Sequence, residues 1–343
     1  NIMLIEQKKA IASLFERALS NMGVNGVSVL LERPKMADHG DLACNVAMQL
    51  ARTLKKSPRD IATQLVEEIE KLSESDSLIE SLEIAGPGFI NMRLSAAAKT
   101  AVVRVALEQK ESFGCCHDHD GESVLLEYVS ANPTGPLHLG HARQGALGDV
   151  LAALMKTQGW KVSREFYYND AGVQIQTLTT SVQLRAKELL GETVQFPDNC
   201  YQGLYIQDIA RDFLDKKTVH TREGHAITAS GDVEDLASIR AFSVAYLKNE
   251  QDSDLRALGV AFDNFYLESS LYTDGLVKRA VDAIIASGHT YEADGALWLK
   301  TTDPEFKRFG DDKDRVMRKK DGTYTYFVPD VAYHLSKFER GFV

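Results

Sequence analysis

The sequence predicts an α/β fold built on a parallel sheet and preceded by a small α+β domain. Two stretches, residues 123–159 and 324–341, have the pattern of a strand, a tight turn and a helix, which is typical of parallel sheets. The first 112 residues instead combine helical stripes with a β-hairpin. We therefore expect one domain at residues 1–112 and a parallel-sheet domain at residues 113–343.

The first domain is predicted from apolar periodicity and from cap and turn residues. Ser57-Pro58-Arg59-Asp60 supplies an N-cap, a proline at the first helical position and an acid two residues later. Gly86-Pro87-Gly88 separates two β-prone runs. The expected elements are a helix at 11–22, a strand at 27–31, helices at 41–54 and 57–72, a hairpin of 82–85 with 89–94, and a helix at 95–111.

The second strand of this hairpin places Phe89 and Asn91 on one face, because side chains alternate along a strand. An aromatic ring beside an amide can stack on an unpaired base and hydrogen-bond its edge. A core position for Phe89 and a turn-satisfying role for Asn91 explain the same pattern. The residues alone leave both interpretations open.

Residues 123–159 are the centre of the second domain. Residues 123–129 are mostly apolar without alternation, which predicts a strand buried on both faces of a parallel sheet. Residues 130–136 hold two prolines and a glycine, which excludes helix and predicts a tight connection. A helix follows from His138, with Gly159 placed as its C-terminal cap. Its apolar stripe consists of Leu147, Val150, Leu151, Leu154 and Met155.

The start of this helix carries His138-Leu139-Gly140-His141. A helix N-terminus at the mouth of a sheet attracts anions, and the missing side chain of Gly140 leaves the backbone open to a flat ring or a phosphate. The pattern suits a nucleoside triphosphate. The alternatives are a zinc site, which usually needs histidines at i and i+4 and a third ligand, and a pair of capping histidines, for which we expect no need of the glycine.

The remaining elements are expected in chain order, with two insertions at 191–231 and about 289–322. Asp294-Gly295 predicts the turn of a hairpin, and the dense mixed charge of residues 311–320 predicts a solvated loop. Asp330 is placed as a plain N-cap of the last helix. The expected elements are strands at 161–168, 262–267 and 324–328, helices at 172–190, 233–258, 274–286 and 332–340, and the hairpin at 290–299.

Composition narrows the function classes. The chain has 343 residues and a formal net charge of −10, which argues against coating nucleic acid by bulk attraction, since such binding depends on basic surface. The charge is uneven, because residues 1–112 carry 14 Lys and Arg against 15 Asp and Glu. Most of the acidity therefore lies in the second domain.

Neither a membrane span nor a signal peptide is expected, because no apolar run approaches roughly 18 residues. The cysteines form no C-x-x-C pair, which favours a reducing cytoplasm. The run Cys115-Cys116-His117-Asp118-His119 has no second ligand cluster, so we interpret it as a polar linker and assign no metal site.

The segment around the two histidines resembles a known family. Ser130 to Arg143, Ser-Ala-Asn-Pro-Thr-Gly-Pro-Leu-His-Leu-Gly-His-Ala-Arg, is similar to the adenylate-forming signature of class I aminoacyl-tRNA synthetases, and its first seven residues resemble arginyl-tRNA synthetases in particular. The resemblance covers essentially the whole chain. Further matches are Tyr167 to Gly172, Tyr201 to Tyr205, Glu268 to Leu271, Asp321 to Tyr326 and Asp330 to His334.

The resemblance implies a Rossmann-like catalytic domain that acts as an arginine–tRNA ligase, with ATP as co-substrate. Mg²⁺ would be carried on the phosphates without a dedicated protein site. His138 and His141 would be catalytic and, with Gly140, would bind ATP. The arginine-binding residues implied are Ser130, Ala131, Asn132, His141, Tyr326 and Asp330, with Glu127 as a further candidate anion.

The same resemblance implies that Phe89 and Asn91 contact the elbow of tRNA(Arg). It also implies a monomer when the protein is complete. The Lys-Met-Ser-Lys loop and the helical anticodon-binding domain of the family are not found up to Val343, so we expect an N-terminal portion of a synthetase. The alternatives are a non-catalytic tRNA-binding fragment and a related nucleotidyltransferase acting on another acid.

Overall fold

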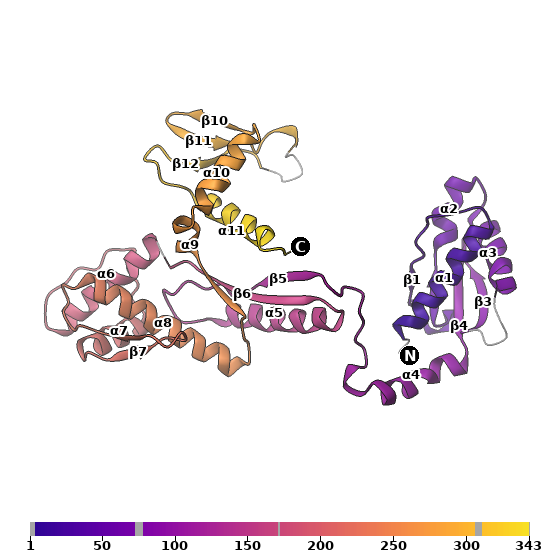
Figure 1. Cartoon of the computed structure of the whole chain (residues 1–343), viewed down its shortest axis with the longest axis horizontal. Helices are drawn as coiled ribbons and strands as arrows, with labels where there is room; N and C mark the ends of the chain where they lie inside the picture. Colours follow the sequence, from indigo (N-terminus) through magenta and orange to yellow (C-terminus); the bar gives the residue numbers. More distant parts are fainter. Residues whose placement is uncertain (1–3, 73–77, 171, 306–310, 343) are drawn as a thin grey trace. The chain divides into compact units, whose positions relative to one another are not determined.

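The computed structural model describes residues 4–72, 78–170, 172–305 and 311–342. The chain divides into two compact units, Asn1–Gly114 and Cys115–Val343. In Figure 1 the first unit runs from indigo to purple and the second from magenta to yellow.

The N-terminal unit is an antiparallel sheet covered by helices. The strands follow the order β1-β2-β4-β3, and Ile90, Met92 and Leu94 of β4 face the hydrophobic core. Helices α1, α2 and α3 pack on one another and close that core (Figure 1). The elements are α1 (Ile5–Asn21), β1 (Leu31–Glu32), β2 (Leu42–Cys44), α2 (Val46–Leu54), α3 (Pro58–Leu72), β3 (Ile79–Ala85), β4 (Phe89–Leu94) and α4 (Ala96–Gln109).

Cap residues, turn residues and apolar periodicity predicted most helices and strands of this unit. The Ser57 hydroxyl accepts from the Asp60 amide at 3.1 Å, so the predicted cap of α3 is confirmed, as is the β3–β4 hairpin. The helix predicted at 41–54 is wrong in its first part. Residues Leu42–Cys44 form β2, because pairing with β4 outweighs the helical periodicity there.

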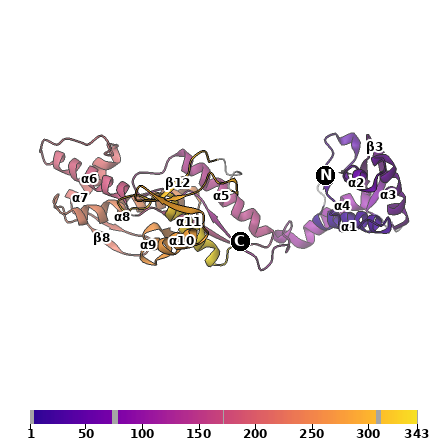
Figure 2. The same ribbon diagram turned by 90° about the horizontal axis from the view of Figure 1, so that it is seen from above.

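The second unit is centred on a parallel sheet with the order β5-β6-β9. Helix α5 lies along this sheet, and α6, α7 and α8 form a helical body with the small β7–β8 hairpin (Figures 1 and 2). The elements are β5 (Ser123–Glu127), α5 (Leu139–Thr157), β6 (Lys161–Tyr168), α6 (Val173–Leu189), α7 (Leu204–Leu214), β7 (Thr218–His220), β8 (Ala226–Thr228), α8 (Leu236–Leu258) and β9 (Asn264–Leu267).

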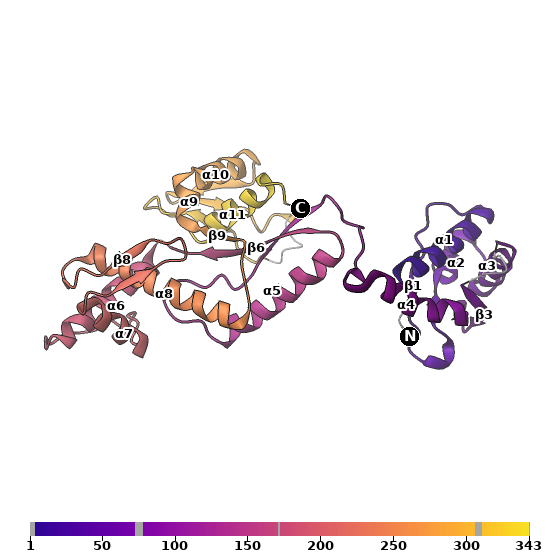
Figure 3. The ribbon, with the colours of Figure 1, turned by 60° about the horizontal axis from the view of Figure 1, so that its bottom comes forward.

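The last part of the unit packs helices beside a second sheet. Helices α9, α10 and α11 lie next to one another (Figure 3). They share one hydrophobic core with Leu297 and Met317 of the antiparallel sheet β10-β11-β12. Asp294 and Gly295 both have positive φ, 51° and 77°, as the predicted hairpin turn requires. The elements are α9 (Glu268–Thr273), α10 (Leu276–Ala286), β10 (Thr290–Ala293), β11 (Ala296–Leu299), β12 (Arg315–Arg318) and α11 (Phe327–Glu339).

Four predictions in this unit are corrected. The strand β5 is only partly buried, and it is shorter than residues 123–129. The loop predicted at 311–320 contains β12, paired with β11. The strand predicted at 324–328 is absent from the described residues, because α11 already begins at Phe327. The predicted stripe of α5 faces solvent: Leu147, Val150 and Leu154 are 67%, 57% and 58% exposed.

Helix α5 packs on the sheet through its small residues instead. Gly145, Gly148 and Ala152 are its buried positions. A Cβ atom at Gly148 would lie 2.2 Å from the ring of Tyr128, so the aromatic ring occupies the space that a side chain would take. Close approach of the helix to the sheet therefore depends on glycine, which a search for apolar stripes does not detect.

Candidate active site

The connection between β5 and α5 begins with two strained residues. Val129 and Ser130 have φ of 68° and 46°, and a left-handed conformation is rare for a β-branched residue such as valine. Ser130 Oγ donates to Glu127 Oε1 at 3.0 Å and accepts from the Tyr167 amide at 3.2 Å. These contacts fix the turn to both neighbouring strands, and strain of this kind is concentrated at functional sites.

The start of α5 carries two histidines whose rings cap the helix. His138 is the N-cap residue, and its Nδ1 accepts from the Gly140 amide at 3.1 Å. His141 Nδ1 accepts from the His138 amide at 3.2 Å, and the rings stack with centroids 3.7 Å apart. Burial and the neighbouring His138 lower the pKa of His141, which favours the neutral ring. Because both Nδ1 atoms accept, the proton of each neutral ring is on Nε2.

Gly140 lies against this cap. A Cβ atom at position 140 would lie 2.9 Å from Cε1 and 3.0 Å from Nδ1 of His138, so the exposed His138 ring would have to shift to admit a side chain. The expectation that capping alone needs no glycine stays a prediction. The glycine lets the His138 ring lie over the first turn, which leaves its Nε2–H for an anion.

The metal alternatives gain no support from the described side chains. Within residues 4–72, 78–170, 172–305 and 311–342, no three His, Cys, Asp or Glu are grouped as a metal site. His117 Nδ1 lies 3.0 Å from an Asp120 carboxylate oxygen, and His119 Nδ1 lies 3.3 Å from one of Glu122.

The residues implied for the arginine α-groups lie in the turn itself. Ala131 is 4% exposed, and Asn132 Nδ2 donates to Gln174 Oε1 at 2.5 Å. The amide of Asn132 is thereby oriented, and its Oδ1 is the atom left to accept from a ligand. Gln174, in the first turn of α6, was not singled out from the sequence.

The residues implied for the guanidinium lie at the start of α11. Tyr326 precedes the helix and is 73% exposed, and Asp330 lies in its first turn. Asp330 is therefore not the N-cap, which corrects the plain-cap interpretation. Burial raises the pKa of Asp330, the charge of Glu127 raises it further, and His334 and Lys337 oppose the rise.

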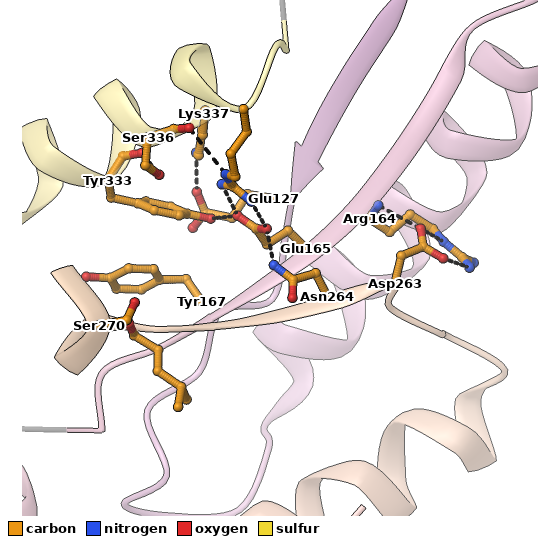
Figure 4. A network of polar contacts seen from close by, with 12 residues as sticks. Glu127, Arg164, Glu165, Tyr167, Asp263, Asn264, Ser270, Tyr333, Ser336 and Lys337 are labelled. Atoms are coloured by element: carbon orange, nitrogen blue, oxygen red, sulfur yellow. Dashed lines mark hydrogen bonds and ion pairs between the residues drawn. The ribbon is translucent and has the colours of Figure 1, made fainter. Parts of the chain in front are cut away.

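Glu127 already has a cation beside it. Its Oε2 accepts from Lys337 Nζ of α11 at 2.8 Å (Figure 4). Lys337 is seven residues after Asp330, so both side chains lie on one side of α11. The structure thus brings Glu127, Asp330 and Lys337 into one cluster of charges.

Next to Glu127, a buried ion pair fixes α11 to the sheet. Glu165 of β6 is 0% exposed, and its oxygens accept from Tyr333 Oη at 2.5 Å, Asn264 Nδ2 at 2.6 Å and two Arg340 nitrogens at 2.7 and 2.9 Å (Figure 4). Burial alone would raise the pKa of Glu165, but the hydrogen bonds, with Arg340 first, hold it below its usual value.

A cavity of about 550 Å³ lies between the start of α6 and the start of α11, and neither Glu127 nor Asp330 is among its described lining residues. Tyr326 and Gln174 line it, but His138 and His141 are not among its described lining residues. Glu268, which carried no role in the sequence interpretation, also lines it, and it accepts from Tyr167 Oη at 2.9 Å. Burial raises the pKa of Glu268, and the charges of Asp330 and Asp170 add to the rise.

In the N-terminal unit, Phe89 and Asn91 lie on the face of β4 opposite Ile90 and Met92. Phe89 is 38% exposed and lies outside the core, whereas Asn91 is 7% exposed in a central strand. A core role for Phe89 is therefore wrong. Contact of either residue with tRNA stays a prediction.

Parallel strands, a strained turn and a helix N-terminus presenting histidine donors define a nucleotide-binding α/β fold. The profile described as "tRNA synthetases class I (R), catalytic domain" matches residues 102–340, and the "Arginyl tRNA synthetase N terminal domain" matches residues 9–94. The chain therefore belongs to the arginyl family of class I tRNA synthetases.

Curated relatives and solved structures agree with this membership. The arginine–tRNA ligase of Herminiimonas arsenicoxydans is 57% identical over 99% of this chain and 59% of the relative, and that of Cupriavidus metallidurans is 57% identical over 99% and 56%. The chain thus spans less than two thirds of these relatives. The Thermus thermophilus arginyl-tRNA synthetase shares the fold, with a TM-score of 0.66, 24% identity, and coverage of 96% of this chain and 53% of that chain.

Proposed function

We propose that the protein containing this chain is an arginine–tRNA ligase, which activates L-arginine with ATP and transfers it to the 3′ end of tRNA(Arg). The observation that carries the proposal is the arrangement around the β5–α5 turn. His138 and His141 use Nδ1 in the cap at the helix N-terminus, which leaves their Nε2–H groups for a ligand, while Glu127, at the end of the preceding strand, shares a charge cluster with Asp330. One side suits phosphates and the other suits a guanidinium.

In the first step, an arginine carboxylate oxygen attacks the α-phosphorus of ATP. The new O–P bond replaces the bond to the bridging oxygen, so arginyl-adenylate forms and pyrophosphate leaves. His138 and His141 donate hydrogen bonds to the phosphate oxygens as charge develops, and they act electrostatically rather than as nucleophiles. Gly140 leaves room for the adenine, and Mg²⁺ enters on the phosphates of the substrate. A ribose hydroxyl of the tRNA then attacks the carbonyl carbon and AMP leaves.

The arginine α-groups meet the turn residues 130–132 and His141. The Ser130 hydroxyl hydrogen is already used by Glu127, so Ser130 and Ala131 contribute through their backbone, and Asn132 accepts from the α-ammonium through Oδ1. At the other end, Asp330, Glu127 and the Tyr326 hydroxyl receive the guanidinium. Five donors in a fixed fork need several acceptors, so lysine or citrulline would leave some of them unpaired.

The N-terminal unit supplies the tRNA contact in this proposal. Phe89 offers an exposed ring for a base, with Asn91 beside it in the strand. Lys8, Arg33 and Lys35 line a cavity of about 620 Å³ in the same unit, where their charge suits a phosphate backbone.

A cytoplasmic monomer is the setting we propose for the complete protein. The four cysteines are free thiols, as suits a reducing compartment. Among the described residues, no helix is both long and apolar enough to cross a membrane.

The test is arginine-dependent pyrophosphate exchange with tRNA(Arg) present. We compare the 343-residue chain with a version extended to the length of its relatives. We expect exchange with arginine but not with glutamate or cysteine. We also expect exchange by the 343-residue chain to be about 10²–10³-fold slower than by the extended version, because loss of one preorganised charge, here the lysine of the Lys-Met-Ser-Lys loop, usually costs that much. Equal exchange with glutamate would refute the substrate assignment. Rates within about threefold would show that the histidine segment alone suffices for the chemistry.

The tRNA contact is tested separately. Phe89→Ala combined with Asn91→Ala is expected to weaken tRNA binding by about 1–3 kcal/mol, because stacking on one base contributes that much. Unchanged binding together with a large loss of melting temperature would assign both residues to the fold instead.

A further inference from the structure

The 130–136 turn is held from outside by three helices that follow it in the chain. Tyr205 Oη of α7 donates to the Thr134 carbonyl at 2.9 Å, and Gln174 of α6 accepts from the Asn132 side chain. Gln251 of α8 reaches the turn from 116 to 119 residues away in sequence. Each helix of the α6–α8 body thus places one polar side chain against the same short turn.

Gln251 is the one of these three side chains that hydrogen-bonds the turn at two backbone carbonyls. Its Nε2 donates to the carbonyls of Asn132 at 3.0 Å and Gly135 at 2.8 Å, and the residue is 0% exposed. The two acceptors fix the amide orientation, because the reversed amide would set its oxygen against two carbonyl oxygens. Its own Oε1 is buried and has no partner in the described part of the chain. A buried amide with one end unsatisfied is better explained by what its other end holds than by packing.

The two carbonyls that Gln251 holds have a special place in the sequence. Asn132 precedes Pro133 and Gly135 precedes Pro136, so both belong to peptide bonds whose nitrogen carries no hydrogen. The planes of these two peptides set the direction in which the turn leaves Asn132 and enters His138. Gln251 fixes both planes with one side chain.

We propose that Gln251, assisted by Tyr205, is a positioning residue for adenylate formation. It holds the 130–136 turn so that Asn132 and the His138–His141 pair keep the spacing that arginine and ATP require. The role rests on the proposed function, and it makes the α6–α8 body part of the catalytic apparatus. Disturbance of that body reaches the turn through these two side chains.

The experiment compares Gln251→Met with Gln183→Met. Methionine keeps the length of glutamine but donates no hydrogen bond. Gln183 is the matched control, because its Nε2 also donates to a carbonyl, that of Val233, within the α6–α8 body but away from the turn. Tyr205→Phe removes one oxygen only, and it serves as the mild variant if Gln251→Met does not fold.

The first measurement is amide hydrogen exchange in the 343-residue chain, followed at Ser130, His138 and Gly140, whose amides donate hydrogen bonds at the two ends of the turn. Loss of the Gln251 contacts is expected to speed exchange at these amides about tenfold, a factor typical of one or two lost hydrogen bonds, whereas Gln183→Met leaves them unchanged. Tyr205→Phe should give a smaller increase in the same amides. Equal exchange in the Gln251 and Gln183 variants overturns the proposal.

The second measurement is pyrophosphate exchange by the extended chain. Gln251→Met is expected to lower kcat about 10- to 100-fold while KM for arginine changes less than about threefold. A small displacement of the turn disturbs the alignment of the reacting groups in the transition state more than it weakens the binding of arginine. Equal kcat in the Gln251 and Gln183 variants overturns the positioning role. Absence of exchange in the unsubstituted chain refutes the proposed function instead, and the amide measurement then still decides whether Gln251 holds the turn.

Discussion

Glu127 and Glu165 are paired positions of two neighbouring parallel strands, but their carboxylates have different surroundings and, we propose, different roles. They lie on β5 and β6, and each receives a cation from α11, Lys337 or Arg340. Glu165 is fully buried, and its two oxygens accept four hydrogen bonds. Glu127 is partly exposed, and within the described part of the chain its carboxylate accepts hydrogen bonds from Ser130 and Lys337.

The difference separates a structural carboxylate from one that can serve a ligand. A carboxylate has about four acceptor positions, so Glu165 has none left while Glu127 keeps room for another donor. Burial makes the difference large, because a buried charge must be fully paired whereas an exposed one is paired partly by water.

The largest effect is expected from Glu165→Ala. Its removal leaves Arg340 without a counter-charge at a site that is mostly buried, so the free energy of unfolding should fall by about 3 kcal/mol, measured by urea denaturation. Glu339→Gln is the control on the same helix, because Glu339 pairs with Arg279 where both side chains are exposed, and its loss should cost less than about 1 kcal/mol. Similar losses in the two variants would remove the distinction between buried and exposed pairs.

Glu127→Gln should instead affect the substrate. A neutral amide has no negative charge to attract the guanidinium and only one acceptor oxygen in place of two, so KM for arginine should rise about tenfold in pyrophosphate exchange. The free energy of unfolding should change by less than about 1 kcal/mol. A large loss of stability with an unchanged KM would make Glu127 a structural residue like Glu165.

The pH dependence should separate Glu165 from Asp330, because their pKa values move in opposite directions. The pKa of Glu165 is below its ordinary 4.5, so its stabilisation is present above the pKa of the unfolded chain and is lost as the pH falls through the folded value. The pKa of Asp330 is above its ordinary 3.8, so its stabilisation is present below that value and is lost as the pH rises through the folded one.

Urea denaturation at several pH values tests this for Glu165→Gln and Asp330→Asn. The stability difference between Glu165→Gln and the unsubstituted chain should shrink in acid, whereas Asp330→Asn should be relatively more stable at neutral pH. If Asp330 receives the guanidinium as proposed, its ionised form is the one that binds arginine, and binding should weaken as the pH falls towards the raised pKa of Asp330. Loss of arginine binding at the same pH in Asp330→Asn would mean that another group titrates.

The smallest effect is expected from Lys337→Met. This variant removes the ammonium beside Glu127 and should lower KM for arginine about two- to threefold, within the range of a partly exposed ion pair, because the guanidinium then meets no competing cation. An increase in KM would show that Lys337 orients Glu127 for the substrate rather than competing with it.

Much of the fold was predictable because its signals are local. Ser57 caps α3, Asp294-Gly295 turns β10 into β11, and prolines with a glycine end β5 and lead into α5. The predicted site residues followed from the family segment at 130–143 and from Tyr326 and Asp330. The structure now shows His138, Gly140 and His141 in one cap, and Glu127 paired with Lys337 of the helix that carries Asp330.

The failures share a cause. Residues 42–44 and 315–318 became part of sheets because distant strands, β4 and β11, were there to pair with them. Leu147 and Leu154 of α5 were expected inside, but the ring of Tyr128 selected Gly148 for the contact. Periodicity predicts that a helix has an apolar side, but it does not show which side the neighbouring elements cover.

The sequence by itself determined most of the helices, the two hairpins, the strand–turn–helix unit at 123–159 and the chemical groups in its turn, since caps, turns and periodicity depend on residues a few positions apart. Only the tertiary structure decided which groups work together. Lys337 lies beside Glu127, Gln174 orients Asn132, and Gln251 holds two carbonyls from more than a hundred residues away. These contacts join positions with no local relation, because the side chains meet only after the parallel strands and the α6–α8 body have packed.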